Sequence, residues 1–241
     1  MYRENIWELI ESINKKLEPG IEGTLEGPIS TLVIPKNSGL KGYAWKVLLE
    51  AGLDVNEAQE IGKNELRIRY LTLLLRRGED IPQIVADQFR IKKPVVGLTG
   101  DDLFDEYCLT NPSNPLKIEN TYDWFDSEAE FLRPALCLLF PVEKEKQKSA
   151  GRVAINPKYE MTSRQYLEKS SFMKDRFYRP FLYAGDLEDS VQRDLNACCI
   201  DTVYSGDSRK KSGLEVADIL RFSDLVLISP FKDGYKIPEE R

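Results

Sequence analysis

The feature that most constrains the fold is the regular alternation of short apolar runs with amphipathic segments. Apolar runs at 31–35, 95–100, 135–140, 198–203 and 225–228 read as strands, and patterns of helical period lie between them. Such alternation is typical of an α/β protein with largely parallel sheets. A stretch rich in Asn, Pro, Ser and Thr at 109–128 predicts a connection between two domains, and 241 residues are enough for two modest ones.

Composition narrows the class of protein. Hydrophobic residues make up 41% and charged residues 31% of the chain, which is typical of a folded, soluble protein. The apolar runs are far shorter than the roughly 20 residues that span a bilayer, and residues 1–30 lack the apolar core of a secretory signal. We therefore expect a cytoplasmic protein without a membrane partner. The net charge of −6 argues against nucleic acid as a partner.

Two residue types limit the chemistry. The chain has no histidine, which excludes imidazole base catalysis, histidine-containing triads and histidine-ligated metals. Acid–base work, if any, falls to carboxylates, Lys or Tyr. Cys108, Cys137, Cys198 and Cys199 show no metal-binding spacing, so we expect buried, reduced thiols.

The stretch "CCIDTVYSGDSRKKSGLEV", residues 198–216, carries the clearest candidate site. Ser205, Gly206, Asp207 and Ser208 separate an expected strand from a basic segment and a helix expected at 212–223, and Arg209 begins the run of three cations. A small-residue loop between a strand and a helix directs backbone N–H groups at an anion, and the two hydroxyls add donors. An ordinary strand-to-helix turn is the alternative interpretation.

Five stretches in series resemble the catalytic region of the ATP phosphoribosyltransferases of histidine biosynthesis. The loop residues Asp201, Val203, Ser205, Gly206, Ser208, Gly213 and Leu214 match that family's D-x-V-x-[ST]-G-x-T-L-x-x-N-G-L spacing without a gap, and Gly185 and Glu188 match its upstream G-x-x-E. "RRGEDIPQIVAD…VGLTGDDLFDE", "VIPKNSGL…LLEAGLD" and "RVAINPKY…SRQYLEK" are similar to three further family motifs. The resemblance spans about residues 30–230.

This resemblance implies two periplasmic-binding-protein-like lobes of type II, with the active site in the cleft between them. Lobe one would comprise 1–108 plus 212–241, and lobe two 109–211. The implied reaction transfers phosphoribosyl from its diphosphate donor to ATP and releases pyrophosphate, with Mg²⁺ as cofactor. ATP and phosphoribosyl diphosphate would then be the substrates, and a homo-oligomer or a separate regulatory subunit the protein partner.

The resemblance also implies residue roles. Residues 205–209 would hold the 5′-phosphate of the sugar, and Asp201 and Glu188 would be catalytic, facing ribose hydroxyls or metal. Lys36, Arg77 and Asp80 would lie on lobe one, near pyrophosphate or nucleotide; no side chain is assigned as a metal ligand. Asp80 as a helix cap, Arg77 as a surface cation and Glu188 as a first-turn acid are the structural alternatives.

Several positions depart from the family pattern. Asp207 places a carboxylate inside the anion loop, Arg209 replaces an apolar Leu, and the usual glycine after Lys36 is absent. These changes fall on binding loops. They keep open a divergent paralogue, or a non-catalytic two-lobed binding or regulatory protein for a nucleotide, phosphosugar or other small anion.

Overall fold

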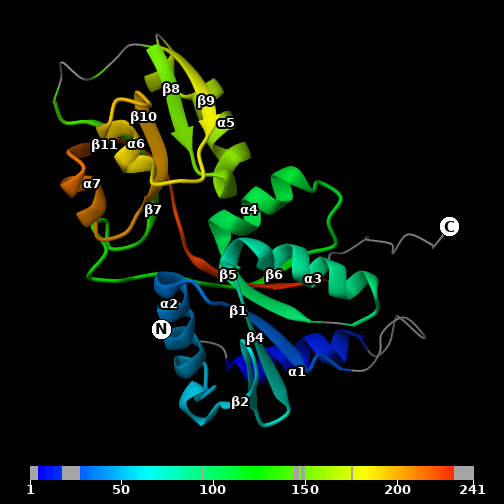
Figure 1. Ribbon diagram of the computed structural model, residues 1–241. Helices are drawn as coiled ribbons and strands as arrows, with labels where there is room; N and C mark the ends of the chain where they lie inside the picture. The colour runs from blue at the N-terminus through cyan, green and yellow to red at the C-terminus, as the bar shows by residue number, and fades with distance from the viewer. Residues whose placement is uncertain are drawn as a thin grey trace. The chain divides into compact units, whose positions relative to one another are not determined.

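The computed structural model describes residues 5–17, 28–93, 95–143, 147, 150–174 and 176–230. The chain forms two compact units, of which unit 1 takes 1–107, 111–122 and 225–241, and unit 2 takes 108–110 and 123–224. Each unit has its own sheet, coloured by chain position in Figure 1. None of the helices that the structure describes is long and apolar enough to cross a membrane.

Unit 1 is built on a seven-stranded mixed sheet with the order β2-β3-β4-β1-β5-β12-β6. Only β4-β1 and β1-β5 pair in parallel, and the remaining neighbours are antiparallel. The central strands are almost fully buried, as their continuous apolar sequences predict. The strands are β1 (Thr31–Pro35), β2 (Gln59–Gly62), β3 (Glu65–Ile68), β4 (Leu71–Arg76), β5 (Val96–Gly100), β6 (Lys117–Tyr122) and β12 (Leu225–Ser229), and the α-helices are α1 (Ile6–Leu17), α2 (Ser38–Glu50), α3 (Ile81–Arg90) and α4 (Asp101–Thr110).

Unit 2 is built on a five-stranded sheet with the order β11-β7-β10-β8-β9. Here β10-β8 and β8-β9 are parallel, while β7 is antiparallel to both of its neighbours. The strands are β7 (Ala135–Pro141), β8 (Ala150–Ile155), β9 (Phe177–Leu182), β10 (Cys198–Val203) and β11 (Leu214–Phe222), and the α-helices are α5 (Glu160–Lys169), α6 (Leu187–Gln192) and α7 (Asp207–Lys211).

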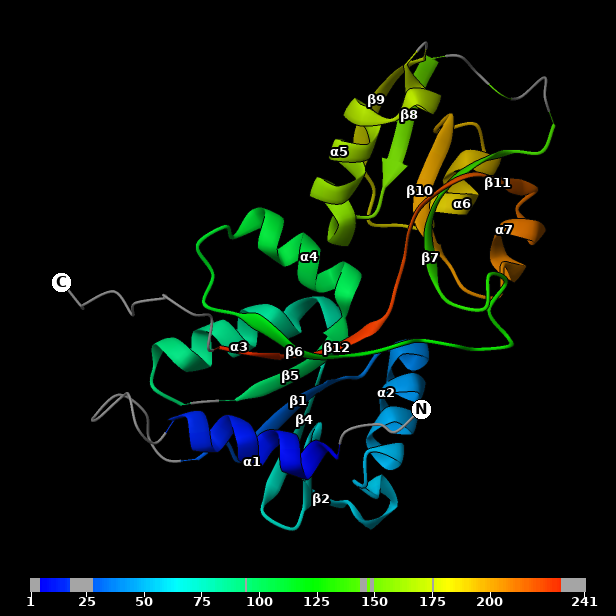
Figure 2. The same ribbon diagram turned by 180° about the vertical axis from the view of Figure 1, so that it is seen from behind.

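The two faces of the unit 2 sheet are covered by different elements, as Figure 2 shows from behind. Alternate residues of β7 (Ala135, Cys137 and Leu139) pack with Leu187 and Val191 of α6 in one apolar cluster. Phe140 points to the other face, where the rings of Phe172 and Tyr178 pack edge-on against it. The core of unit 2 therefore lies on both faces of its central strands.

The α/β class with two units is confirmed, and so is the prediction of free thiols: all four cysteines are free, and three of them are buried. Parallel pairing is less extensive than predicted, because it is confined to two strand pairs in each sheet. The helix predicted at 212–223 is wrong: after the short α7, residues 214–222 form β11 beside β7.

The predicted unit boundaries shift for the same reason. Because β11 belongs to the sheet of unit 2, the chain returns to unit 1 at 225 and not at 212. Because β6 belongs to the sheet of unit 1, residues 117–122 are not part of a connection, and the main crossing into unit 2 lies at 123 and not at 109.

Candidate functional site

The predicted site residues of unit 2 gather at one edge of its sheet. Strands β8, β9 and β10 run parallel, so their carboxyl ends share an edge, which is where open α/β sheets bind ligands. Asn156 and Lys158 follow β8, Asp186 and Glu188 follow β9, and Asp201 lies within β10 ahead of the 205–209 loop. Sequence segments from 156 to 209 thus meet at one place.

The loop turns at Gly206 in a conformation that favours glycine. Gly206 is in the left-handed region with φ of 75°, and α7 begins directly after it. The carbonyl of Tyr204 accepts a hydrogen bond from the amide of Glu130 at 2.7 Å, which ties the loop to the segment before β7. The turn is therefore held at Tyr204 by this hydrogen bond and leads directly into α7 after Gly206.

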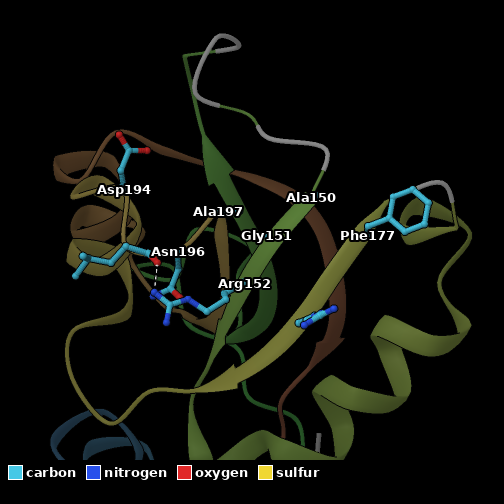
Figure 3. A pocket seen from close by; sticks show the side chains of 9 residues that line it. Ala150, Gly151, Arg152, Phe177, Asp194, Asn196 and Ala197 are labelled. Atoms are coloured by element: carbon cyan, nitrogen blue, oxygen red, sulfur yellow. Dashed lines mark hydrogen bonds between the residues drawn. The ribbon is translucent and has the colours of Figure 1, made fainter.

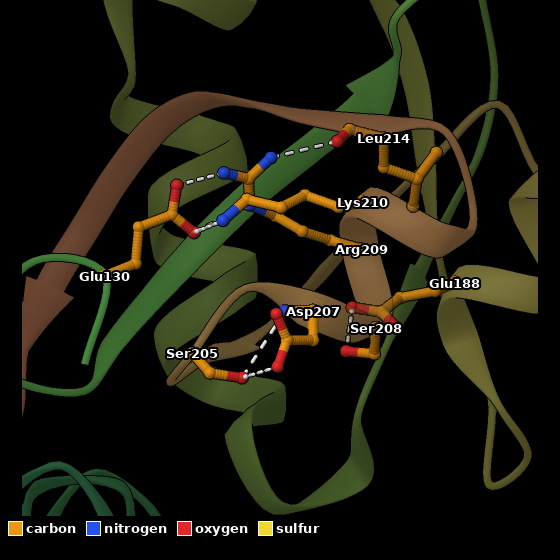
Figure 4. A network of polar contacts seen from close by, with 8 residues as sticks. All are labelled: Glu130, Glu188, Ser205, Asp207, Ser208, Arg209, Lys210 and Leu214. Carbon is orange, nitrogen blue, oxygen red and sulfur yellow. Dashed lines mark hydrogen bonds and ion pairs between the residues drawn. The ribbon is translucent and has the colours of Figure 1, made fainter. Parts of the chain in front are cut away.

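The two loop hydroxyls are directed at carboxylates of the same unit (Figure 4). Ser205 Oγ donates to Asp207 Oδ2 at 3.1 Å, and it accepts from the Asp207 amide at 3.4 Å. Ser208 Oγ donates to Glu188 Oε1 at 3.0 Å. Both hydroxyl donors of the loop are thus bonded within the unit.

The cation of the loop is also paired. Arg209 Nε donates to Glu130 Oε2 at 3.0 Å, its Nη2 contacts the other oxygen of Glu130, and its Nη1 donates to the carbonyl of Leu214 at 3.0 Å. The side chains of Arg209 and Glu130 are only 11% and 20% exposed. Lys210 Nζ lies 4.0 Å from the same carboxylate. Arg209 therefore joins α7 to the segment before β7 and does not face solvent.

The two predicted catalytic carboxyls lie in a protonation-favouring environment. Burial raises the pKa of Glu188 and is reinforced by the negative charge of Asp201, against the hydrogen bond from Ser208. Burial also raises the pKa of Asp201, although the amide of Thr202, which donates to it at 2.8 Å, and the charge of Lys158 act in the opposite direction. The edge as a whole is acidic.

Glu130 is the functional-site residue that sequence reasoning missed. It lies just beyond the predicted connection at 109–128, and the resemblance gave no acid at that place. The signal was Arg209 itself, because a cation that replaces an apolar residue at a buried position needs an anionic partner. Asn156 and Lys158 also went unnoticed, and only their position after β8 marks them.

In unit 1, the structure brings Lys36 and Arg77 together at the carboxyl ends of the parallel strands β1 and β4. The Lys36 amide donates to the carbonyl of Arg76 at 2.7 Å, and Asn37 Oδ1 accepts from the Gly78 amide at 3.0 Å. Lys36, Arg77 and Asp80 are exposed. Asp80 precedes α3 but makes no side-chain capping bond, so the capping alternative is not observed.

The described residues form no cluster of side chains suited to hold Mg²⁺. Within the described ranges, no three carboxylate or thiolate groups lie together as metal ligands. Mg²⁺ as a cofactor stays a prediction from the resemblance, and no step below depends on it.

Comparison with known proteins identifies similar folds but assigns the chain to no family. No family model matches the chain, and no curated protein matches it. Among solved structures, a chain of the ATP phosphoribosyl transferase (HisG:HisZ) complex from Thermotoga maritima superimposes with a TM-score of 0.61 and 16% identity, over 84% of this chain and 88% of that one.

Two further structures match more loosely. The Candida albicans CA3427 gene product, described as exhibiting the generic periplasmic binding protein fold, gives a TM-score of 0.47 at 10% identity over 84% of this chain and 63% of that one. An ABC transporter protein from Parabacteroides distasonis gives 0.44 at 11% identity over 86% of this chain and 66% of that one. At these identities the likeness concerns the arrangement of helices and strands alone.

Proposed function

We propose that this chain is a non-catalytic binding protein with the fold of an ATP phosphoribosyltransferase, whose unit 2 edge receives the hydroxyl groups of a small sugar-containing ligand. One observation carries the proposal. Each side chain of the 205–209 loop that could donate to a phosphate is bonded to a carboxylate of the same unit: Ser205 to Asp207, Ser208 to Glu188 and Arg209 to Glu130.

Electrostatic repulsion by the neighbouring carboxylates disfavours a phosphate at this loop. A phosphate would have to displace Asp207 and approach Glu188, while Arg209, the nearest cation, is already neutralised by Glu130. Two like unit charges 4 Å apart repel by about 4 kcal/mol at an effective dielectric constant of 20. One ionised carboxylate at this distance therefore opposes a phosphate by more than one hydroxyl donor contributes, since a single hydrogen bond to a charged group is worth about 1.5–3 kcal/mol.

The same edge suits hydroxyl groups. Asp201 and Glu188 are acceptors when ionised, Lys158 is a donor, and the side chains of Asp201, Asn156 and Lys158 are partly buried. Carboxylates and amides at the carboxyl ends of strands can hydrogen-bond vicinal hydroxyls without opposing a charge. A ribosyl or other polyol group fits this set of partners better than a free phosphate does.

A second candidate is the phosphoribosyl transfer that the resemblance implies. It is favoured by the left-handed Gly206 turn and by the contact between Ser208 and Glu188, which brings the loop motif and the upstream G-x-x-E motif together. Catalysis of this kind depends on positioning and electrostatics and needs no histidine. In this reading ATP and phosphoribosyl diphosphate are the substrates.

A turnover assay separates the two candidates. The purified chain is mixed with ATP, phosphoribosyl diphosphate and MgCl₂, and pyrophosphate release is measured beside the near-ultraviolet absorbance of the adduct. We expect no release above the protein-free rate. Release that Ser208→Ala abolishes would establish the transferase and reject the binding protein.

A binding assay tests the ligand class. We expect ribose to raise the melting temperature more than ribose 5-phosphate does at equal concentration, because any ligand bound only to the native state stabilises it and the phosphate meets the carboxylates. The effect of ribose should be lost in Asp201→Ala. A larger shift with ribose 5-phosphate in the parent would contradict the proposal.

A further inference from the structure

A pocket lies at the opposite end of the parallel strands of unit 2, at the amino ends of β8 and β9. It has a volume of about 540 Å³ and is lined by Ala150, Arg152, Phe177, Arg179 and the segment 194–197 (Figure 3). Its size falls within the usual range for small-molecule sites. Because the proposed function uses only the carboxyl ends of these strands, this pocket is independent of it.

Two neighbouring arginines line this pocket. Arg152 of β8 and Arg179 of β9 are partners in the parallel register, so their side chains leave neighbouring strands on the same face of the sheet. Like charges placed opposite each other destabilise a sheet unless an anion lies between them. Both arginines are exposed, so solvent screens this repulsion, and the carboxylate of Asp194 also lines the pocket; an anion placed between the two guanidinium groups would be attracted by both.

The side chains of the two arginines differ in their contacts within the protein. Arg152 Nη2 donates to the carbonyl of Leu195 at 2.7 Å, and its guanidinium lies 4.7 Å from the centre of the Phe181 ring. Arg179 makes no ion pair or hydrogen bond with any part of the chain that the structure describes, and it is exposed. Arg152 is thus held in place with donors to spare, and Arg179 is unused.

The wall of the pocket holds an unsatisfied acceptor. Asn196 is only 3% exposed, and its Nδ2 donates to Ser190 Oγ at 3.0 Å. Its Oδ1 finds no hydrogen-bond partner among the described residues. An ionised phosphate or carboxylate has no donor for this covered oxygen, so Asn196 forms part of the wall and does not contribute to the recognition of an anion.

An aromatic side chain stands at the rim. Phe177 is 83% exposed, although a side chain of this size is normally covered, and it lies two residues before Arg179 on the same face of β9. Exposed aromatic rings beside arginines are suited to stacking against a flat ligand.

We propose that this pocket binds a small aromatic anion, with its phosphate or carboxylate group between Arg152 and Arg179 and its ring against Phe177. Both acid groups match the fork of a guanidinium, so they share this recognition chemistry. Ala150, Gly151 and Ala197 contribute little side-chain volume to the lining of the pocket.

Calorimetric titration with four probes tests the proposal. Phenyl phosphate and benzoate carry both features, whereas inorganic phosphate lacks the ring and phenol lacks the charge. We expect phenyl phosphate or benzoate to bind with a Kd of about 1 mM or tighter, at least tenfold more tightly than inorganic phosphate and phenol. The stronger of the two identifies the acid group.

Variants locate the binding. Arg179→Gln should weaken it at least tenfold, and Phe177→Ser at least threefold, without lowering the melting temperature, because both residues are exposed. Lys169→Gln, on the exposed surface of α5, makes the same charge change and should alter the Kd less than twofold. The site would be overturned if neither aromatic anion bound at 10 mM, roughly ten times the expected Kd. It would also be overturned if inorganic phosphate bound as tightly as the aromatic anions, or if Arg179→Gln and Phe177→Ser each bound them as tightly as the parent does.

Discussion

Gly206 is glycine for two separate reasons that substitutions can distinguish. Its φ of 75° disfavours a side chain, and a Cβ would collide with Glu130 Oε2, the oxygen that holds Arg209. Gly213 has a similar φ of 64° but no atom within 4 Å of a built Cβ. The left-handed backbone is thus common to both glycines, and the clash is confined to Gly206.

We expect Gly213→Ala to lower the free energy of unfolding by about 1 kcal/mol through strain alone, and Gly206→Ala to lower it by about 2 kcal/mol or more. Gly42→Ala, in the exposed interior of α2 with open space around it, should instead stabilise by about 0.5–1 kcal/mol. Denaturant titration measures all three. Equal losses at 206 and 213 would show that the Glu130 contact does not constrain the loop.

The raised pKa of Glu188 predicts how stability depends on pH. A carboxyl with a raised folded-state pKa contributes stability that is present below its ordinary value of 4.5 and lost as the pH rises through the folded value. Gln at this position cannot ionise and still accepts from Ser208. Glu188→Gln should therefore be more stable than the parent at pH 7, and the difference should disappear as the pH falls below 4.5.

Thermal denaturation across that pH range measures the effect, with the exposed Glu168→Gln of α5 as the control that should change little at any pH. A Glu188→Gln variant that is less stable than the parent at pH 7 would mean that ionised Glu188 supports the loop through a stronger interaction than its burial costs.

At the scale of elements, the Arg209–Glu130 pair joins α7 to the segment before β7. Because both side chains are largely covered, removing one leaves the other without its partner in a partly buried place. Arg209→Ala should lower the free energy of unfolding by about 2–3 kcal/mol. Arg193→Ala removes an ion pair whose arginine is 70% exposed, so it should cost less than about 0.5 kcal/mol.

An apolar pair at these two positions provides the converse test. Glu130→Leu with Arg209→Leu should recover most of the stability lost in either single variant, because replacing both partners leaves no unpaired charge. Additive losses in the double variant, measured by the same denaturant titration, would show that the two side chains act independently.

The elements also show where sequence reasoning reached its limit. The runs at β1, β5, β7, β10 and β12 were predictable because continuous apolar sequences of this length favour buried strands. β11 was not, because bulges between Val216 and Asp218 and between Ile219 and Arg221 break its alternation. The spacing of Val216, Ile219 and Leu220 then imitates a helix. β6 is a polar edge strand, and "KIENTY" carries little strand signal.

At the scale of the molecule, the α/β class followed from the alternation of elements, and the division into two units from the polar stretch at 109–128 and the chain length. That Glu188 and Ser208 lie together was an expectation from the family resemblance. The return of the chain to unit 1 at 225 could not be predicted, because the composition around Ser223 and Asp224 gives no sign of a domain boundary. The pairing of Arg209 with Glu130 could not be predicted, because the two residues lie 79 positions apart in sequence and no motif connects them.

The measurement that tests the account most directly is calorimetric titration of the parent and of Asp207→Asn with ribose 5-phosphate. If the loop is closed by its own carboxylates, the parent binds weakly, and Asp207→Asn binds at least tenfold more tightly, a gain of about 1.4 kcal/mol. Glu168→Gln, which makes the same change in net charge, should leave the parent value unchanged. Tight binding by the parent that Asp207→Asn alters less than twofold would contradict the account.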